Sequence, residues 1–92
     1  MTFDWDDGKA RENLEKHRVT FAEAETVFLD SLARIEDDPD HSLDERREII
    51  FGHSAAGRVL LVSFVQRGQT IRIISARKAD KEERRRYEEE VF

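Results

Sequence analysis

The sequence predicts an α+β domain in which helices pack on an antiparallel sheet. Three observations lead to this fold class. Two helix-type stretches near the start are joined by about three residues, three strand-type segments then follow one another across short turns, and a charged stretch with a helix-capping signal comes last. The predicted order is β-α-α-β-β-β-β-α, in one domain that spans residues 1–92.

The first two elements are a short strand and a helix. Residues 2–5 read as a strand in which Phe3 and Trp5 point to one face. Asp6 or Asp7 is a good N-cap for the helix that follows, which runs to about residue 16. The spacing i, i+4, i+7 gives this helix an inner face of Ala10, Leu14 and His17.

A second helix completes a tight helical hairpin. Thr20 and Glu23 have the spacing of a capping box and place its start. Its apolar stripe consists of Phe21, Ala24, Val27 and Phe28. Residues 32–36 then form a strand, and residues 37–42 form a polar, exposed loop.

The rest of the chain predicts a three-stranded meander and a last helix. Residues 46–53, 59–66 and 69–76 form the strands, and the last two strands are apolar on both faces, as expected in a sheet interior. Gly68 supplies the positive φ that a two-residue hairpin turn needs. Asp80 caps the last helix, which ends near residue 90 and has Glu83 at the capping-box position.

Composition limits the classes of function. The chain has no cysteine, which favours the cytosol, and no apolar run near the roughly 20 residues that cross a bilayer. The net charge of −5 argues against general binding to nucleic acid. Residues 67–92 nevertheless hold eight Lys and Arg against six Asp and Glu, so a local basic site on an acidic body is compatible with the sequence.

Cationic residues at the end of the third meander strand are candidates for phosphate binding. Arg72 and Arg77 can bind a phosphate bidentately and stabilise charge in phosphoryl transfer, and Lys78 can add to binding. Strict alternation puts the two arginines on opposite faces, unless the strand stops at Ala76 and leaves Arg77 free. The alternative is that Arg72 pairs with a carboxylate of a neighbouring strand while Arg77 and Lys78 are solvated.

Candidate acid–base groups lie elsewhere in the chain. Lys16 and His17 end the first helix, and a histidine can act as acid or base near neutral pH. Arg46 and the Tyr87 phenol are candidates for the same concave site. The alternative is that Lys16 and His17 only end a helix and that Tyr87 packs in the core with Val91 at i+4.

No metal site is predicted. The acidic loop lacks the ordered spacing and glycine of a calcium loop; its residues are Asp37, Asp38, Asp40, His41 and Asp44. The sequence also has no Gly-rich phosphate loop, no Ser-His-Asp order and no Cys-His nucleophile. The expected chemistry therefore needs no cofactor.

The motifs together resemble the BrnT family of toxins, whose fold is similar to RelE. The opening of the chain matches in Phe3-x-Trp5-Asp6-x-x-Lys9-Ala10, Asn13, Lys16-His17-x-Val19-x-Phe21-x-Glu23-Ala24 and Val27-Phe28. The middle matches in Glu45-Arg46 and Gly52, and the end in Arg72-Ile73-Ile74-Ser75-Ala76-Arg77-Lys78-Ala79 and from Glu83 to Tyr87. The likeness covers nearly the whole chain. One departure is Arg18, where the family often has glycine.

The resemblance implies a cytoplasmic ribonuclease toxin of a type II toxin–antitoxin pair that inhibits translation. A BrnA-like antitoxin with a ribbon-helix-helix region would neutralise it in a hetero-oligomer, and operator DNA would be bound only through that antitoxin. Position by position, the implied site is Lys16, His17, Arg46, Arg77 and Tyr87, with Arg72 and Lys78 binding substrate.

Two hypotheses follow for the chemistry. In the first, cleavage of RNA needs no metal: His17 or Lys16 takes the proton of a ribose 2′-hydroxyl, and arginines stabilise the phosphorane. In the second, motivated by the net charge of −5 and by Arg18, the chain is a catalytically weak binding module that serves as the toxin half of an autoregulatory repressor.

Overall fold

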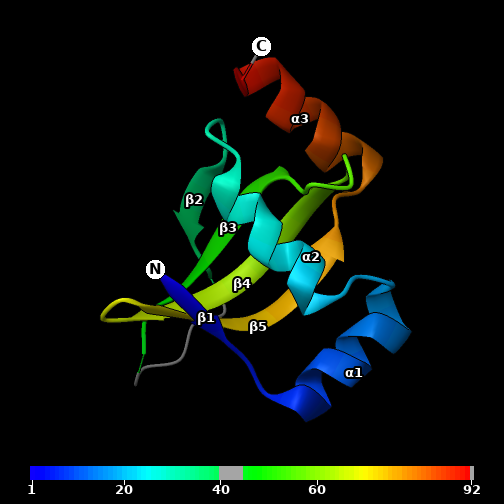
Figure 1. Ribbon diagram of the computed structural model, residues 1–92. Coiled ribbons are helices and arrows are strands. Elements are labelled where there is room, and N and C mark those ends of the chain that lie inside the picture. Colours follow the sequence, from blue (N-terminus) through cyan, green and yellow to red (C-terminus); the bar gives the residue numbers. More distant parts are fainter. Residues whose placement is uncertain (40–44, 92) are drawn as a thin grey trace.

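A computed structural model describes residues 1–39 and 45–91 and has a five-stranded sheet with three α-helices (Figure 1). The helices are α1 (Asp7–His17), α2 (Phe21–Thr26) and α3 (Lys81–Val91), and a short 3-10 helix, η1 (Val27–Leu29), continues α2. The strands are β1 (Thr2–Asp4), β2 (Arg34–Asp37), β3 (Arg47–His53), β4 (Val59–Arg67) and β5 (Thr70–Lys78). The predicted element order is confirmed. No helix in the described part of the chain is long and apolar enough to cross a membrane.

The strands lie in the order β1-β5-β4-β3-β2. The four strands from β2 to β5 pair antiparallel, as predicted, whereas β1 joins the edge of β5 in parallel, with Thr2 beside Thr70 and Asp4 beside Arg72. The α+β fold class is confirmed, and the direction of β1 is the feature that differs. The three residues of β1 carry no sequence signal for its direction in the sheet. Its parallel pairing depends on the direction of β5, which follows from the hairpin between β4 and β5.

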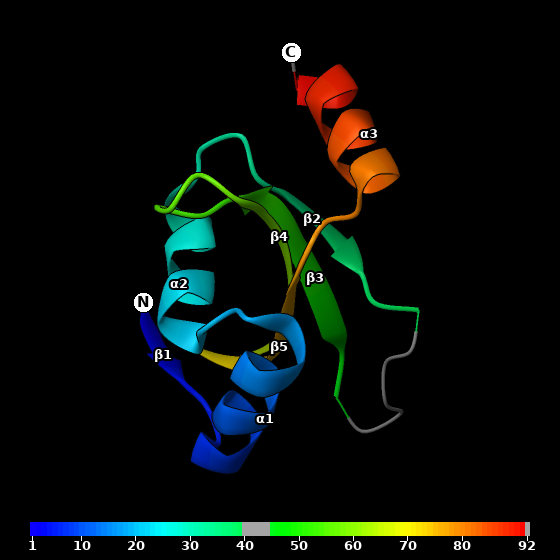
Figure 2. The same cartoon turned by 90° about the vertical axis from the view of Figure 1, so that its right-hand side faces the viewer.

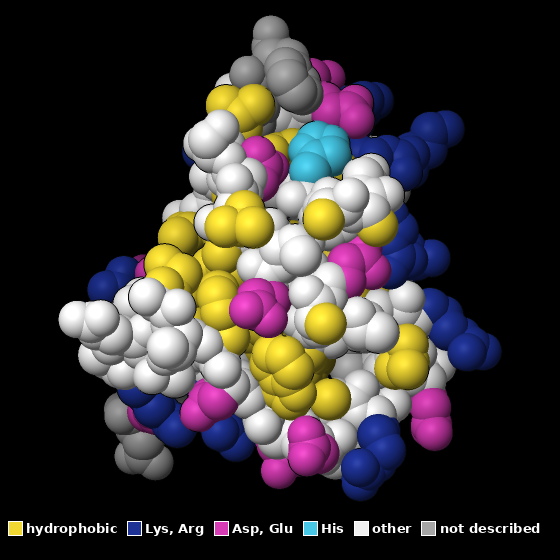
Figure 3. Space-filling view, in the orientation of Figure 1, with side chains coloured by type: hydrophobic (Ala, Val, Ile, Leu, Met, Phe, Trp, Pro, Cys, Tyr) yellow, Lys and Arg dark blue, Asp and Glu magenta, His cyan; other side chains and the backbone are white. Residues whose placement is uncertain are grey.

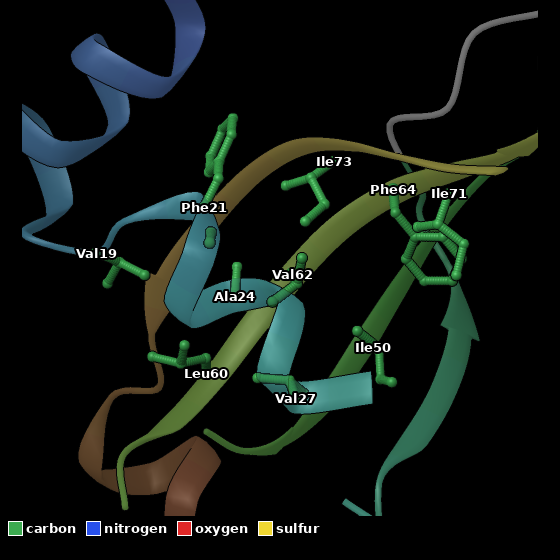
Figure 4. Packing of buried hydrophobic residues seen from close by; sticks show 11 residues of the cluster. Val19, Phe21, Ala24, Val27, Ile50, Leu60, Val62, Phe64, Ile71 and Ile73 are labelled. Carbon is green, nitrogen blue, oxygen red and sulfur yellow. The ribbon is translucent and has the colours of Figure 1, made fainter. Parts of the chain in front are cut away.

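The hydrophobic core fills the space between the sheet and the segment formed by α2 and η1 (Figure 4). The predicted stripe of α2 is confirmed, because Phe21, Ala24 and Val27 are buried and Phe28 packs against the core. Phe28 lies edge-on between Phe3 and Phe64, with centroid distances of 5.1 Å to each ring. These contacts fix α2 on one face of the sheet.

The predicted inner face of α1 is confirmed at Ala10, which packs against the core, and at the half-buried His17, but it is wrong at Leu14. Leu14 is 43 % exposed, and Asn13 is buried in its place. The Asn13 amide donates to the carbonyls of Val19 and Ala76 and accepts from the Ala76 N–H. It thus satisfies the backbone of β5 beyond the end of β1, where a strand neighbour is missing.

A bulge in β5 reverses the alternation on which the prediction for the two arginines rested. Ser63 of β4 pairs with Ser75, but the next residue, Phe64, pairs with Ile73, so β5 has one extra residue there. Arg72 consequently lies opposite Val65 and Arg77 opposite Leu61, and these two β4 residues share a face. The prediction that Arg72 and Arg77 point to opposite faces is therefore wrong, and so is the predicted end of the strand at Ala76.

The face of the sheet turned away from α2 is called the open face here, and its residues include Ile49, Phe51, Leu61, Arg72 and Arg77. In Figure 2, α1 and α2 lie on one side of the sheet and α3 stands at its upper end. The helix α3 is fixed there by Tyr87, whose ring contacts those of Phe51 and His53 at 5.1 and 5.4 Å. One end of the open face is thus bordered by α3.

Candidate active site

A cleft of about 220 Å³ lies between the open face and α3. The strands β2, β3, β4 and β5 form its floor and α3 forms its wall; the lining residues are Glu36, Ile49, Phe51, Leu61, Arg77, Glu83, Arg86 and Glu90. The floor is apolar at Ile49, Phe51 and Leu61, and two arginines and three carboxylates complete the lining. Arg77 is therefore the sequence-predicted site residue that this cleft contains.

Arg77 is held by Glu83 of α3. Its Nη1 and Nη2 donate to the two carboxylate oxygens of Glu83 at 2.8 and 2.9 Å. Glu83 also completes the predicted capping box, because it accepts from the Asp80 N–H while Asp80 accepts from the Glu83 N–H. The hydrogen bonds from Arg77, aided by the Asp80 bonds and opposed by burial, lower the pKa of Glu83 from 4.5 to about 2.

The Glu83 contact leaves part of the Arg77 guanidinium free. Nη1 uses its two hydrogens on Glu83 and the Lys78 carbonyl, and Nη2 uses one on Glu83. The Nε–H and the second Nη2–H have no acceptor among the described residues, and together they form the side-on fork of the guanidinium. Glu83 can therefore orient Arg77 while a phosphate binds the same side chain.

Arg72 lies on the open face with Arg77 but at a distance. The two arginines are separated by four residues of the neighbouring β4, or roughly 13 Å along the strand. Arg72 is 30 % exposed, and its Nη1 is 3.4 Å from Asp4 of the adjacent β1. The sequence alternative, in which Arg72 pairs with a carboxylate on a neighbouring strand, describes this contact.

Lys16 and His17 lie at the edge of the sheet in a hollow of about 220 Å³ between α1 and the bulge. The hollow also contains Ser75, which pairs with Ser63 across the sheet and precedes Arg77 by two residues. His17 is half-buried and Lys16 is exposed, and neither forms an ion pair within the described residues. Ser75 thus connects the hollow with the strand that bears Arg77.

The Tyr87 phenol is not on the surface. Tyr87 is fully buried, and its hydroxyl donates to Asp30 at 2.9 Å. Burial, with the Asp30 hydrogen bond and charge, raises the pKa of Tyr87 to about 12. The structure places Tyr87 in the core, as the alternative interpretation of the sequence predicted, because the ring is the main apolar anchor of a highly charged helix.

Arg46 and Lys78 lie apart from the cleft. Arg46 precedes β3 and donates from Nε and Nη2 to Asp37, at the Arg72 end of the sheet, with 71 % of its side chain exposed. Lys78 pairs with Leu60, so alternation turns it away from Arg77. The structure therefore brings Arg72 and Arg77 to the open face and places Lys16 and His17 at the neighbouring sheet edge. Arg46 and Lys78 lie elsewhere, and Tyr87 is buried between α3 and Phe51 of the open face.

Sequence reasoning did not single out His53 and Asp30. Asp30 accepts from the His53 N–H and the Tyr87 hydroxyl, and its carboxylate lies 3.8 Å from His53 Nδ1. Burial raises the pKa of Asp30, but hydrogen bonds from the His53 and Leu32 backbone and from Tyr87 outweigh this and lower it. A histidine at the end of a strand, next to a turn, was the only signal in the sequence.

The acidic loop falls largely on residues 40–44, which lie outside the described residues. Within residues 1–39 and 45–91 no group of three or more His, Asp or Glu side chains is arranged to hold a metal ion. The predictions for Asp40, His41 and Asp44 thus stay predictions.

Comparison with known proteins gives a family. The model of the family described as "Ribonuclease toxin, BrnT, of type II toxin-antitoxin system" matches residues 5–83. Among solved structures, the crystal structure of the Brucella abortus ribonuclease toxin BrnT is similar, with a TM-score of 0.68 and 25 % sequence identity. The match covers 88 % of this chain and 99 % of the Brucella chain. A search of curated proteins gave no match.

Proposed function

Because the chain belongs to the BrnT family of ribonuclease toxins of type II toxin–antitoxin systems, we propose that it cleaves single-stranded RNA in the cytoplasm, without a metal ion, and so inhibits translation. The observation that supports this proposal is the bulge of β5, which turns both Arg72 and Arg77 to the open face. Two arginines on one face, next to a hollow with a histidine and a lysine, are suited to a phosphodiester substrate.

The proposed reaction is transfer of the phosphodiester within the RNA. The ribose 2′-oxygen attacks the adjacent phosphorus and loses its proton to His17 or Lys16. The bond to the 5′-oxygen of the next nucleotide breaks, and that oxygen takes a proton from a second group of the site or from water, so the products are a 2′,3′-cyclic phosphate and a 5′-hydroxyl. The side-on fork of Arg77 binds the non-bridging oxygens as their negative charge grows. Arg72 holds a neighbouring phosphate.

The direct test is cleavage of a single-stranded RNA by the purified chain in EDTA. Arg77→Lys keeps the charge but not the fork, and we expect it to lower the cleavage rate on the order of 100-fold. The control is Arg85→Gln on the neighbouring α3, since Arg85 is 73 % exposed and forms only a loose ion pair with Glu89, at 3.9 Å. Equal rates for the two variants, or cleavage that appears only with added Mg²⁺, would contradict the proposed mechanism.

A type II toxin has an antitoxin as its partner, and we propose a BrnA-like protein with a ribbon-helix-helix region that alone contacts operator DNA. Exposed apolar residues in one segment support a protein partner, because single-chain proteins seldom leave several together. Leu29, Leu32 and Ile35 are 85 %, 47 % and 55 % exposed. Co-expression tests this: the partner should co-purify with the chain, and Leu29→Asp with Ile35→Asp should weaken the complex.

A second candidate function is a catalytically weak module that only binds the antitoxin. The observation that favours it is that Arg72 and Arg77 both have carboxylate partners, in a chain of net charge −5. Expression of the chain alone in a bacterium separates the two functions. Growth arrest that Arg77→Ala relieves, without loss of folded protein, supports the enzyme; normal growth with abundant folded protein supports the module.

A further inference from the structure

A cationic pocket lies at the end of the sheet, on the other side of α3 from the cleft. It has a volume of about 270 Å³, and its residues come from the end of β3, the start of β4, the end of β5 and the helix α3. The lining residues are His53, Gly57, Arg58, Val59, Lys78, Ala79, Arg84 and Glu88. The lining therefore includes three cations, Arg58, Lys78 and Arg84, together with His53, and only one carboxylate, Glu88. We call this group the hairpin pocket.

Two cations of the hairpin pocket have no carboxylate partner. Neither the Lys78 ammonium nor the Arg84 guanidinium is in an ion pair with any of the described residues. This separates them from Arg72 and Arg77, which are paired with Asp4 and Glu83. Unpaired cations at a concave site attract an anion without first losing a protein partner.

Arg58 is held at the pocket by a half-buried ion pair. Its Nε and Nη2 donate to the carboxylate of Glu23 on α2, and Nη2 also donates to the Arg18 carbonyl. The hydrogen bonds from Arg58 lower the pKa of Glu23, so this carboxylate stays ionised. Nη1 of Arg58 has no acceptor among the described residues, and it is the nitrogen left for a ligand.

His53 adds a ring N–H that can donate a hydrogen bond to an anion. Its Nδ1 faces Asp30 at 3.8 Å, and its ring lines the hairpin pocket with 38 % of the side chain exposed. With Nδ1 on the Asp30 side, Nε2 is the nitrogen left to donate to a ligand. Figure 3 shows Lys and Arg side chains along the right-hand edge of the molecule, from α3 down to α1, which gives an extended ligand a cationic path.

We propose that the hairpin pocket binds a backbone phosphate of the RNA, at a nucleotide outside the one that is cleaved. Lys78 and Arg84 supply the charge, and Arg58 Nη1 and His53 supply oriented N–H donors. The pocket lies on the far side of α3 from the cleft that contains Arg77. An RNA strand that occupies both sites therefore crosses α3. This inference rests on the proposed ribonuclease function and names a further substrate contact.

The experiment measures binding without cleavage, so that it does not depend on catalysis. The probes are inorganic phosphate and a single-stranded 2′-O-methyl oligoribonucleotide, in which the attacking hydroxyl is blocked. We expect Lys78→Gln with Arg84→Gln to weaken binding of the oligonucleotide about tenfold at low salt, and to reduce the salt dependence by about 0.7 per lost contact. Arg85→Gln with Lys81→Gln, the same charge change next to the pocket, is the control.

NMR gives the location of the bound anion. Inorganic phosphate should shift the ring signals of His53, and this shift should be absent in the Lys78→Gln, Arg84→Gln protein. Equal oligonucleotide affinities for the double variant and its control would overturn the proposal. Binding of a polyglutamate peptide, with no binding of the oligonucleotide, would also overturn it by assigning the pocket to an acidic protein segment. If the native chain binds the oligonucleotide but does not cleave RNA, that result would instead count against the ribonuclease proposal alone.

Discussion

Arg18 ends α1 in a conformation that suits glycine better than arginine. Its φ is 58° and its ψ is 34°, which is the left-handed helical region. The turn is kept because the Arg18 N–H donates to the Leu14 carbonyl, and the Arg18 carbonyl accepts from Arg58. The missing glycine therefore leaves the turn in place and costs conformational energy instead.

Replacement of Arg18 by glycine should stabilise the protein. We expect Arg18→Gly to raise the free energy of unfolding by about 1 kcal/mol, since glycine adopts a positive φ without steric conflict. Urea unfolding measures the change. Glu15→Gly, inside α1, is the matched control and should be destabilising by about 1 kcal/mol, because its backbone is helical. A loss of stability in both variants would contradict the strain at Arg18.

The Tyr87 hydroxyl should matter for stability. Tyr87→Phe keeps the ring contacts with Phe51 and His53 and removes only the hydrogen bond to Asp30. We expect a loss of about 2 kcal/mol in the free energy of unfolding, because the acceptor is an ionised carboxylate. If Tyr87→Phe instead unfolds like the native protein but cleaves RNA much more slowly, the phenol acts in catalysis and its assignment to the core is wrong.

The elements could be predicted from the sequence because periodicity and capping report local structure. Thr20 and Asp80 accept hydrogen bonds at the starts of α2 and α3, and the continuous apolar run of β4 marks that strand. The bulge could not be predicted, since Ile73 and Ile74 are alike in size and polarity, and either fits the buried side. The shared face of Arg72 and Arg77, on which the site depends, follows from that one extra residue.

The edge of β5 shows where helix periodicity was misleading. The apolar Leu14 suits an inner face, but the position next to β5 needs a group that bonds to the backbone, and Asn13 provides it. The burial of a polar residue depends on a backbone neighbour 63 positions away in sequence, which no local pattern contains.

Removal of the Asn13 amide should loosen α1 from the sheet. We expect Asn13→Ala to lower the free energy of unfolding by about 3 kcal/mol, because three buried backbone groups lose their partner. Leu14→Ala, next to it on the exposed surface, should change it by less than about 1 kcal/mol. The two variants would have reversed effects if Leu14 were the inner residue. Hydrogen exchange of the Ala76 amide is a local measurement of the same contact.

At the scale of the whole molecule, ion pairs join α3 to the sheet and join the turn between β3 and β4 to α2. Arg77 pairs with Glu83, Arg34 with Glu90 and Arg58 with Glu23. The Arg77 and Arg58 hydrogen bonds lower the pKa values of Glu83 and Glu23, so both carboxyl groups bind protons more weakly in the folded protein than in the unfolded chain. Such groups stabilise the fold above the unfolded pKa and lose that contribution as the pH falls.

The molecule should therefore become less stable in acid. For Glu83 the loss should begin below about pH 4.5 and continue toward pH 2, the interval between its unfolded and folded pKa values. Urea midpoints at pH 7, 5 and 3 measure it, and Glu83→Gln should show a smaller fall between pH 5 and pH 3 than the native chain. Glu89→Gln, on the exposed side of α3, is the control and should fall like the native chain. Equal falls in all three proteins would exclude a role for Glu83.

The parallel pairing of β1 with β5 has a consequence for the order in which the molecule is made. Thr2 is synthesised before its neighbour in the sheet, Thr70, and the chain between them must be made before the two can meet. The bulged strand with Arg72 and Arg77 is also late in synthesis. A nascent chain shorter than residue 78 therefore has neither a closed sheet nor an open face with both arginines, so the surface proposed to act on RNA arises only after that strand has been released from the ribosome.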